Sequence, residues 1–244
     1  MRLADLLFPP KCVSCRKILS AEKRNGKTVG IALCPDCRAE WEKAKLEKCR
    51  FCGEAMIDCR CKPPLLFENG KIRDCIKLCK YKTGKRVVQN KMIYALKTRA
   101  LWNNETFLSS QLARVLENRV PHAEEAVVTF VPRRTKSIRF YGYDQAAVLA
   151  EGIAENLGAD FVRVIKRRGG LEQKRLRAAE RDKNTKLSLA PRKHIKTDLA
   201  GKTVILVDDV ITSGASMAVC ADILVSLGAD KVYCAAVAET ERRL

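Results

Sequence analysis

The sequence predicts an α/β fold with a mostly parallel sheet, preceded by a small domain of the zinc-ribbon kind. Three observations carry this prediction. Eight of the 12 cysteines lie within the first 61 of the 244 residues. Beyond residue 70, short apolar runs alternate with segments of helical periodicity, as in sheets whose strands are joined by crossover helices. The run at 203–207 (TVILV) is continuous and apolar, as expected of a central strand buried on both faces.

The individual elements follow from local patterns. The weak alternation of residues 72–81 predicts a strand. Apolar residues spaced by four predict a helix, as Leu149, Ile153 and Leu157 do. Gly228 ends the last predicted helix. We expect strands at residues 72–81, 126–132, 161–165, 203–207 and 231–238, and helices at residues 86–98, 105–119, 145–157 and 215–227.

The chain is expected to divide into two domains near residue 68. The first segment is poor in long apolar stretches, so it cannot build much of a core without metal, and the Pro63-Pro64 pair closes it. We expect a double zinc-ribbon domain at residues 1–68 and an α/β domain at residues 69–244.

Paired cysteines in the first segment have metal-ligand spacing. Two C-x2-C pairs are separated by 18 residues, and a third C-x2-C pair is followed six residues later by C-x-C. A C-x2-C turn directs two thiolates toward one point, and two such turns complete a tetrahedral site. Two structural zinc sites are therefore predicted, with no position left open for a substrate. Their ligands are Cys12, Cys15, Cys34 and Cys37 in the first site, and Cys49, Cys52, Cys59 and Cys61 in the second.

Other arrangements of these cysteines remain open. In an interleaved arrangement, Cys12 and Cys15 would share one zinc site with Cys49 and Cys52. Cys75 or Cys79 is an alternative ligand for the second site, because C-x-C is the less common turn. Free thiols throughout are the alternative without metal.

The charge is strongly basic. The formal net charge is +19, and two zinc ions held by four thiolates each would lower it to about +15. Such a charge is compatible with a phosphate-rich partner and equally with a basic surface that binds nothing. At 47% hydrophobic residues, the composition excludes wholesale disorder.

The sequence carries no signal for a membrane or for secretion. No apolar run approaches the roughly 18–20 residues that cross a bilayer. The first residues, MRLADLLFPPKC, lack the apolar core and cleavage site of a secretory signal. We expect a cytoplasmic protein without membrane insertion, in which metal ligation is a better explanation of the cysteines than disulfides.

The sharpest motif follows the apolar strand at 203–207. Asp208 and Asp209 come next, and then the loop 212–216 (TSGAS) at the start of a predicted helix. Backbone N–H groups at a helix N-terminus bind anions, and a glycine permits close backbone approach. Adjacent carboxylates suit ribose hydroxyls, with Mg²⁺ nearby. The pattern predicts a site for a 5-phosphoribosyl group; the alternative is an ordinary strand–turn–helix capped by Asp and Ser.

This stretch resembles the signature that binds phosphoribosyl pyrophosphate (PRPP) in type I phosphoribosyltransferases. The whole chain resembles the ComF family, which joins an N-terminal double zinc ribbon to a phosphoribosyltransferase-like domain. Four motifs carry the resemblance: L-F-P-P-K-C-x2-C (7–15), V-P-R-R-x4-R-x2-G-Y-D-Q-A (131–146), Q-x2-L-x4-R-x2-N (173–184) and V-D-D-V-I-T-S-G-A-S (207–216).

The resemblance implies a site and a reaction. Asp208 and Asp209 would contact the ribose diol of PRPP, which binds with Mg²⁺. The 5′-phosphate would lie on Thr212, Ser213, Gly214, Ala215 and Ser216. Candidate cations for pyrophosphate are Arg133, Arg134 and Arg139, and the lid would contain Gln173, Arg181 and Asn184. An active protein would be a PRPP-dependent phosphoribosyltransferase, a glycosyltransferase, linked to natural transformation and DNA uptake alongside a helicase-type ATPase.

Two residues change the charge of the family pattern. The family usually shows R-G-F-N-Q where this chain has Tyr141-Gly142-Tyr143-Asp144-Gln145. One cation fewer and one anion more predict a weaker hold on pyrophosphate, so PRPP binding is expected more firmly than catalysis.

The rival hypothesis is a non-catalytic protein that binds single-stranded DNA. Residues 163–186 contain ten Lys/Arg against three acids. Phosphates would meet these basic groups and the zinc ribbon, while bases would stack on Phe140, Tyr141 and Tyr143. A solvated, basic lid is the alternative reading of the same run.

Overall fold

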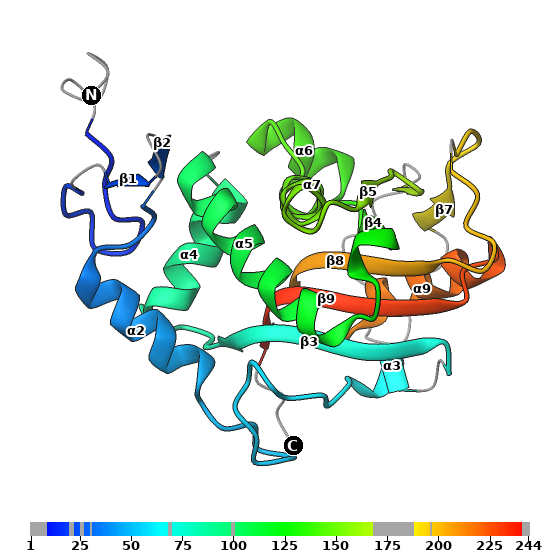
Figure 1. Ribbon diagram of the computed structural model, residues 1–244, viewed down its shortest axis with the longest axis horizontal. Helices are drawn as coiled ribbons and strands as arrows, with labels where there is room; N and C mark the ends of the chain where they lie inside the picture. Colours follow the sequence, from blue (N-terminus) through cyan, green and yellow to red (C-terminus); the bar gives the residue numbers. More distant parts are fainter. Residues whose placement is uncertain are drawn as a thin grey trace.

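A computed structural model describes residues 9–19, 22–24, 27–29, 31–67, 70–98, 101–167, 188–195 and 197–240. Its centre is a five-stranded sheet in the order β3-β9-β8-β4-β5, in which every neighbouring pair is parallel (Figure 1). The strands are β3 (Ile72–Tyr81), β9 (Lys231–Thr240), β8 (Thr203–Ile211), β4 (Val127–Phe130) and β5 (Asp160–Phe161). The predicted α/β class with a mostly parallel sheet is confirmed.

Helices cover both faces of this sheet. Helices α4 (Val88–Thr98), α5 (Trp102–Arg119) and α7 (Gln145–Leu157) lie on one face, above the sheet in Figure 1. Helix α9 (Ala215–Ser226) and the short α3 (Pro64–Phe67) cover the other. Alternate residues of the strands serve the two cores: in β8, Ile205 belongs to the α7 side and Leu206 to the α9 side. Strands buried on both faces explain the continuous apolar runs in the sequence.

The predicted strand at residues 161–165 is wrong. The chain forms the short β5 and then β6 (Ile165–Arg167), which pairs antiparallel with β7 (Leu189–Pro191) away from the main sheet. Val164 and Ile165 are consecutive and both buried in the core beneath α9. One continuous strand would point them to opposite faces, so the chain must turn between β5 and β6.

Four helical segments of the described part of the chain were not expected from the sequence. They are α2 (Pro35–Lys45), α3, the 3₁₀ turn η1 (Ala123–Glu125) and α6 (Thr135–Tyr141). Helix α2 begins directly after Cys34 and contains Cys37, with Pro35 in its first turn, where a missing N–H costs nothing.

The cysteine-rich segment packs on the body of the fold. It contains the small antiparallel ribbon of β1 (Glu22–Arg24) and β2 (Lys27–Val29), followed by α2. Trp41 of α2 is fully buried and meets the ring of Phe107 in α5 edge-on, with 5.7 Å between ring centroids. The first cysteine cluster thus shares one apolar core with α4 and α5. The boundary near residue 68 stays a prediction.

Among the described helices, none combines the length and the apolar character that spanning a membrane requires.

Candidate functional site

The candidate site lies where the chain leaves β4 and β8, two neighbouring parallel strands. After β4 the chain passes through α7 to β5, on one face of the sheet. After β8 it passes through α9 to β9, on the opposite face and in the opposite direction along the sheet. The two connections therefore diverge at the carboxyl ends of the strands, the place where open α/β sheets bind ligands, and we call this place the crevice.

Two adjacent carboxylates project from β8 into this region. The strand continues to Ile211, so Asp208 and Asp209 lie within it rather than at its end, on opposite sides of the pleat. Asp209 is buried; its Oδ2 accepts a hydrogen bond from Gln145 Nε2 at 2.8 Å and lies 3.5 Å from Lys97 Nζ. Burial raises the pKa of Asp208 well above its usual value, and the negative charge of Asp209 raises it further.

The loop that follows has the geometry of an anion site. Gly214 is the N-cap of α9 and has φ of +82°, a conformation that favours glycine. No side chain among the described residues caps the helix, and Ser213 Oγ lies 3.4 Å from the N–H of Ala215. Thr212 and Ser213 are exposed. The N-terminal end of a 12-residue helix therefore opens toward the crevice with its backbone amides and hydroxyls.

The loop after β4 is fixed by Asp144. Its Oδ2 accepts a hydrogen bond from the N–H of Arg133 at 2.9 Å, and its Oδ1 accepts one from the N–H of Ala146 at 3.2 Å, capping α7. Both oxygens thus bind backbone donors, although burial raises the pKa of this carboxyl. The negative charge that departs from the family pattern is engaged in holding the loop.

The other departing residue, Tyr141, packs against Arg133. The guanidinium carbon of Arg133 lies 4.6 Å from the Tyr141 ring centroid, a cation–π contact. The same guanidinium donates to the carbonyl of Lys97 at 3.3 Å. Arg134 and Arg139 are exposed on and beside α6. Of the three predicted cations, one is therefore oriented by protein contacts and two face solvent.

Two basic residues at the site were not identified as site residues from the sequence. Lys97 lies in the last turn of α4 and reaches Asp209, although no motif marks it. Arg167 was counted only within the basic run, yet it donates to the carbonyl of Pro132 at 3.1 Å and to Ser188 Oγ at 3.1 Å. Burial lowers the pKa of Arg167, and nearby Arg134 lowers it further. The predicted lid residues Gln173, Arg181 and Asn184 lie outside the described residues.

Comparison with protein families decides the assignment of this half of the chain. The model described as the phosphoribosyl transferase domain matches residues 111–243, which is more than half of the sequence. The chain belongs to the phosphoribosyl transferase domain family. The matched region begins within α5 and includes both loops of the crevice.

Solved structures give partial matches to this phosphoribosyl transferase domain. A purine phosphoribosyltransferase from Pyrococcus horikoshii Ot3 aligns with TM-score 0.37 and 18% identity over 58% of this chain and 86% of that one. A phosphoribosylpyrophosphate synthetase from Mycobacterium smegmatis aligns with TM-score 0.34 and 21% identity, over 55% of this chain and 33% of that one. The glutamine PRPP amidotransferase from B. subtilis aligns with TM-score 0.37 and 24% identity, over 54% of this chain and 25% of that one. A comparison with curated proteins gave no match.

The eight N-terminal cysteines form two clusters beside the phosphoribosyl transferase domain. Their sulfur atoms lie within 4.8 Å of one another in each cluster, and the pairing is consecutive rather than interleaved. The Cys15 and Cys34 sulfurs are 3.6 Å apart, and the Cys52 and Cys59 sulfurs are 3.7 Å apart. Tetrahedral zinc with Zn–S of about 2.3 Å separates its sulfurs by about 3.8 Å. Both clusters therefore fit zinc, and Cys75 and Cys79 belong to neither.

In each cluster, the first cysteine along the chain has a lowered pKa. Burial raises the pKa of Cys12 and of Cys49, but backbone N–H groups of the following turn outweigh it and lower both values to about 7. For Cys49 these donors are Phe51 and Cys52. Burial raises the pKa of Cys37 in the first cluster and of Cys59 in the second to about 12, so within each cluster one thiol ionises readily while another keeps its proton until metal binds.

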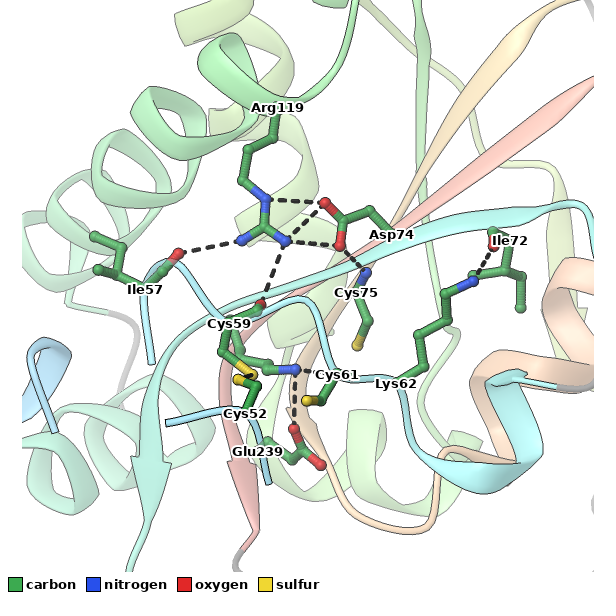
Figure 2. Close-up of polar contacts among 11 residues, drawn as sticks. Cys52, Ile57, Cys59, Cys61, Lys62, Ile72, Asp74, Cys75, Arg119 and Glu239 are labelled. Carbon is green, nitrogen blue, oxygen red and sulfur yellow. Dashed lines mark hydrogen bonds and ion pairs between the residues drawn. The ribbon is translucent and has the colours of Figure 1, made fainter. Parts of the chain in front are cut away.

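The second cluster is bound to the phosphoribosyl transferase domain through buried charges (Figure 2). Arg119 of α5 forms a bidentate ion pair with Asp74 of β3, with N–O distances from 2.6 to 2.9 Å. Its remaining donors reach the carbonyls of Ile57 at 3.1 Å and Cys59 at 3.3 Å. Fully buried Lys77 donates to the carbonyl of Cys61 and lies 3.2 Å from Glu239. These contacts fix the backbone that carries the last two sulfurs.

Proposed function

We propose that the chain binds PRPP, with Mg²⁺, in the crevice between the ends of β4 and β8. The observation that carries this proposal is the direct succession of Asp208, Asp209 and the loop 212–216 at the start of α9, at the point where the two connections diverge. The match to the phosphoribosyl transferase domain family supports it.

Each group of residues would bind a different part of PRPP. The amides and hydroxyls of Thr212, Ser213, Gly214, Ala215 and Ser216 would hold the 5′-phosphate. Asp208 and Asp209 would accept hydrogen bonds from the ribose hydroxyls, and their oxygens suit Mg²⁺. Arg133, Arg134 and Arg139 would bind pyrophosphate, which planar guanidinium groups contact through two parallel hydrogen bonds. Gln173 and Arg181 would close over it.

Lys97 and Arg167 add to these roles. Lys97 orients Asp209 through its ion pair, and Arg167 links the carbonyl at the end of β4 to Ser188. In a transfer reaction, bound Mg²⁺ would stabilise the charge of the departing pyrophosphate. The fixed cations would contribute to the same stabilisation, because preorganised charges lose little on reorganisation.

Titration calorimetry with PRPP and Mg²⁺ tests this proposal. Replacing Asp208→Asn together with Asp209→Asn removes the charge with little change of shape, and the affinity should fall at least about tenfold, because hydrogen bonds to charged groups contribute about 1.5–3 kcal/mol each. Glu155→Gln, at an exposed position on α7, is the matched control and should bind as the wild type does. Unchanged binding by the double variant would refute the assignment of the carboxylates.

We also propose a place for the protein among ComF-like factors of natural transformation, with single-stranded DNA as a second ligand and a helicase-type ATPase as partner. Helix α6 favours this: Phe140 is 79% exposed, next to exposed Arg139 and near exposed Arg134. Tyr141 covers Arg133 and Tyr143 donates to the carbonyl of Leu96, so of the three aromatic residues named for stacking, Phe140 alone is mostly exposed.

Oligonucleotide titrations at two salt concentrations test this second ligand. Affinity should fall steeply with salt. Phe140→Ala should weaken binding by about 5- to 100-fold, the effect of about 1–3 kcal/mol per stacked base. Affinity independent of both salt and Phe140 would exclude this mode of binding.

A further inference from the structure

The short helix α3 lies against the candidate phosphate loop. A Cβ built on Gly214 would lie 3.1 Å from Leu66 Cγ and 3.2 Å from Pro63 Cβ. Leu66 is completely buried and shares its core with Met217 and Cys220 of α9. The apolar side of the loop is therefore formed by residues that stand far from it in the sequence.

This contact constrains the loop more than its own sequence does. The N-terminal end of a helix without a side-chain cap has few local restraints. Gly214 in the left-handed region adds flexibility, since glycine has the largest conformational freedom. Close packing of Leu66 and Pro63 on Gly214 limits that freedom from outside the loop.

The same linker is fixed at its other end by the second cysteine cluster. Cys61, the last sulfur of that cluster, precedes Pro63 by two residues. Between them Lys62 donates to the carbonyl of Ile72 at 2.5 Å (Figure 2). Arg119 and Lys77 hold the carbonyls of Cys59 and Cys61. A short, fully anchored path thus leads from the cluster to the phosphate loop.

The first cluster has no comparable path within the described residues. It belongs to the core on the opposite face of the sheet, with α4 and α5, whereas Leu66 and α9 form the other core. The two clusters are therefore structurally unequal with respect to the crevice.

We propose that Leu66 and Pro63 are positioning residues for the phosphate loop, and that metal in the second cluster, but not in the first, sets their position and thereby the affinity of the loop for phosphate. The consequence for affinity rests on the proposed function of the crevice. The packing itself stands on the contacts between α3 and Gly214.

Amide hydrogen exchange of residues 212–217, together with PRPP titration, tests the positioning role. Leu66→Ala in the full chain should raise exchange in this segment and weaken PRPP binding about tenfold, while Leu66→Met should restore both. The control Leu224→Ala removes an equally buried leucine of the same core, further along α9, and should change neither. Wild-type exchange in Leu66→Ala, or the same change in both alanine variants, would overturn the proposal.

The role of the metal is tested by removing one sulfur from each cluster. Cys61→Ser and Cys15→Ser should each lower the zinc content from about two to about one per chain. Exchange of residues 212–217 should rise in Cys61→Ser alone. Equal exchange in the two variants would overturn the link to the second cluster. If the wild type binds no PRPP, the proposed function fails, while hydrogen exchange still decides the positioning role.

Discussion

At the scale of single residues, the crevice places two carboxylates next to each other in sequence. The pKa of Asp208 is raised because burial and the negative charge of Asp209 disfavour its ionised form. Gly214 holds a left-handed conformation under close apolar packing. The disfavoured charge at Asp208 is a local cost of the kind that concentrates at functional sites because the rest of the fold enforces it, whereas the left-handed backbone itself costs a glycine little.

The raised pKa of Asp208 predicts a stability effect that depends on pH. A carboxyl with a raised pKa in the folded state contributes stability at low pH and loses it as pH rises above the ordinary value of 3.8. Asp208→Asn removes this loss, so its thermal midpoint should exceed that of the wild type by more at pH 8 than at pH 5. Melting curves at the two pH values measure the difference, and a gain that shrinks with pH would contradict the assignment.

Substitution of Gly214 should lower both the stability of the fold and the affinity for PRPP. Gly214→Ala adds a Cβ against Leu66 and strains the left-handed backbone, which should lower the free energy of unfolding by at least about 1–2 kcal/mol and weaken PRPP binding. Gly158→Ala, at φ of +70° with open space around it, has the strain alone and should leave PRPP affinity unchanged. Denaturant unfolding and titration of both variants measure this, and equal losses of affinity would argue against a special role of position 214.

At the scale of elements, the sequence predicted what local signals define. Helix 145–157 was predicted with its observed bounds, because Asp144 caps one end and Gly158 ends the other. The strand at 161–165 was wrong because its pairing depends on where β7 lies, 24 residues away in the sequence. Lys97 and Arg167 could not be predicted as site residues, since only tertiary packing brings the ends of α4 and β6 to the crevice.

The side chain of Asp144 holds both the loop after β4 and the start of α7. Asp144→Ala removes both the α7 cap and the bond to Arg133, and should cost about 1–2 kcal/mol of unfolding free energy. Asp144→Asn keeps one acceptor oxygen, so its loss should be smaller. Urea denaturation compares them; an asparagine variant as unstable as the alanine variant would show that the retained oxygen contributes less than its contact indicates.

At the scale of the whole molecule, the cysteine clusters and the phosphoribosyl transferase domain form one body. One cluster shares the core beneath α4 and α5, and the other is held by Arg119 and Lys77 against β3. The formal charge of +19 is therefore partly offset at fixed places if zinc occupies both clusters. The sulfurs pair consecutively along the chain, which the spacing alone left open.

Metal analysis checks this arrangement. The purified protein should contain about two zinc ions per chain, and exhaustive chelation should abolish cooperative unfolding, since four-thiolate sites stabilise small modules outright. A content of about one zinc per chain would show that one of the clusters does not bind zinc. Cooperative melting of the metal-free chain would show that the clusters are dispensable for the fold.

A crystal structure of the wild-type protein with PRPP and Mg²⁺ tests the assignment of the crevice most directly. The 5′-phosphate should lie within hydrogen-bond distance of the backbone amides of residues 212–216, with the ribose hydroxyls facing Asp208 and Asp209. A phosphoribosyl group bound elsewhere, or a crevice without ligand at saturating PRPP, would contradict it.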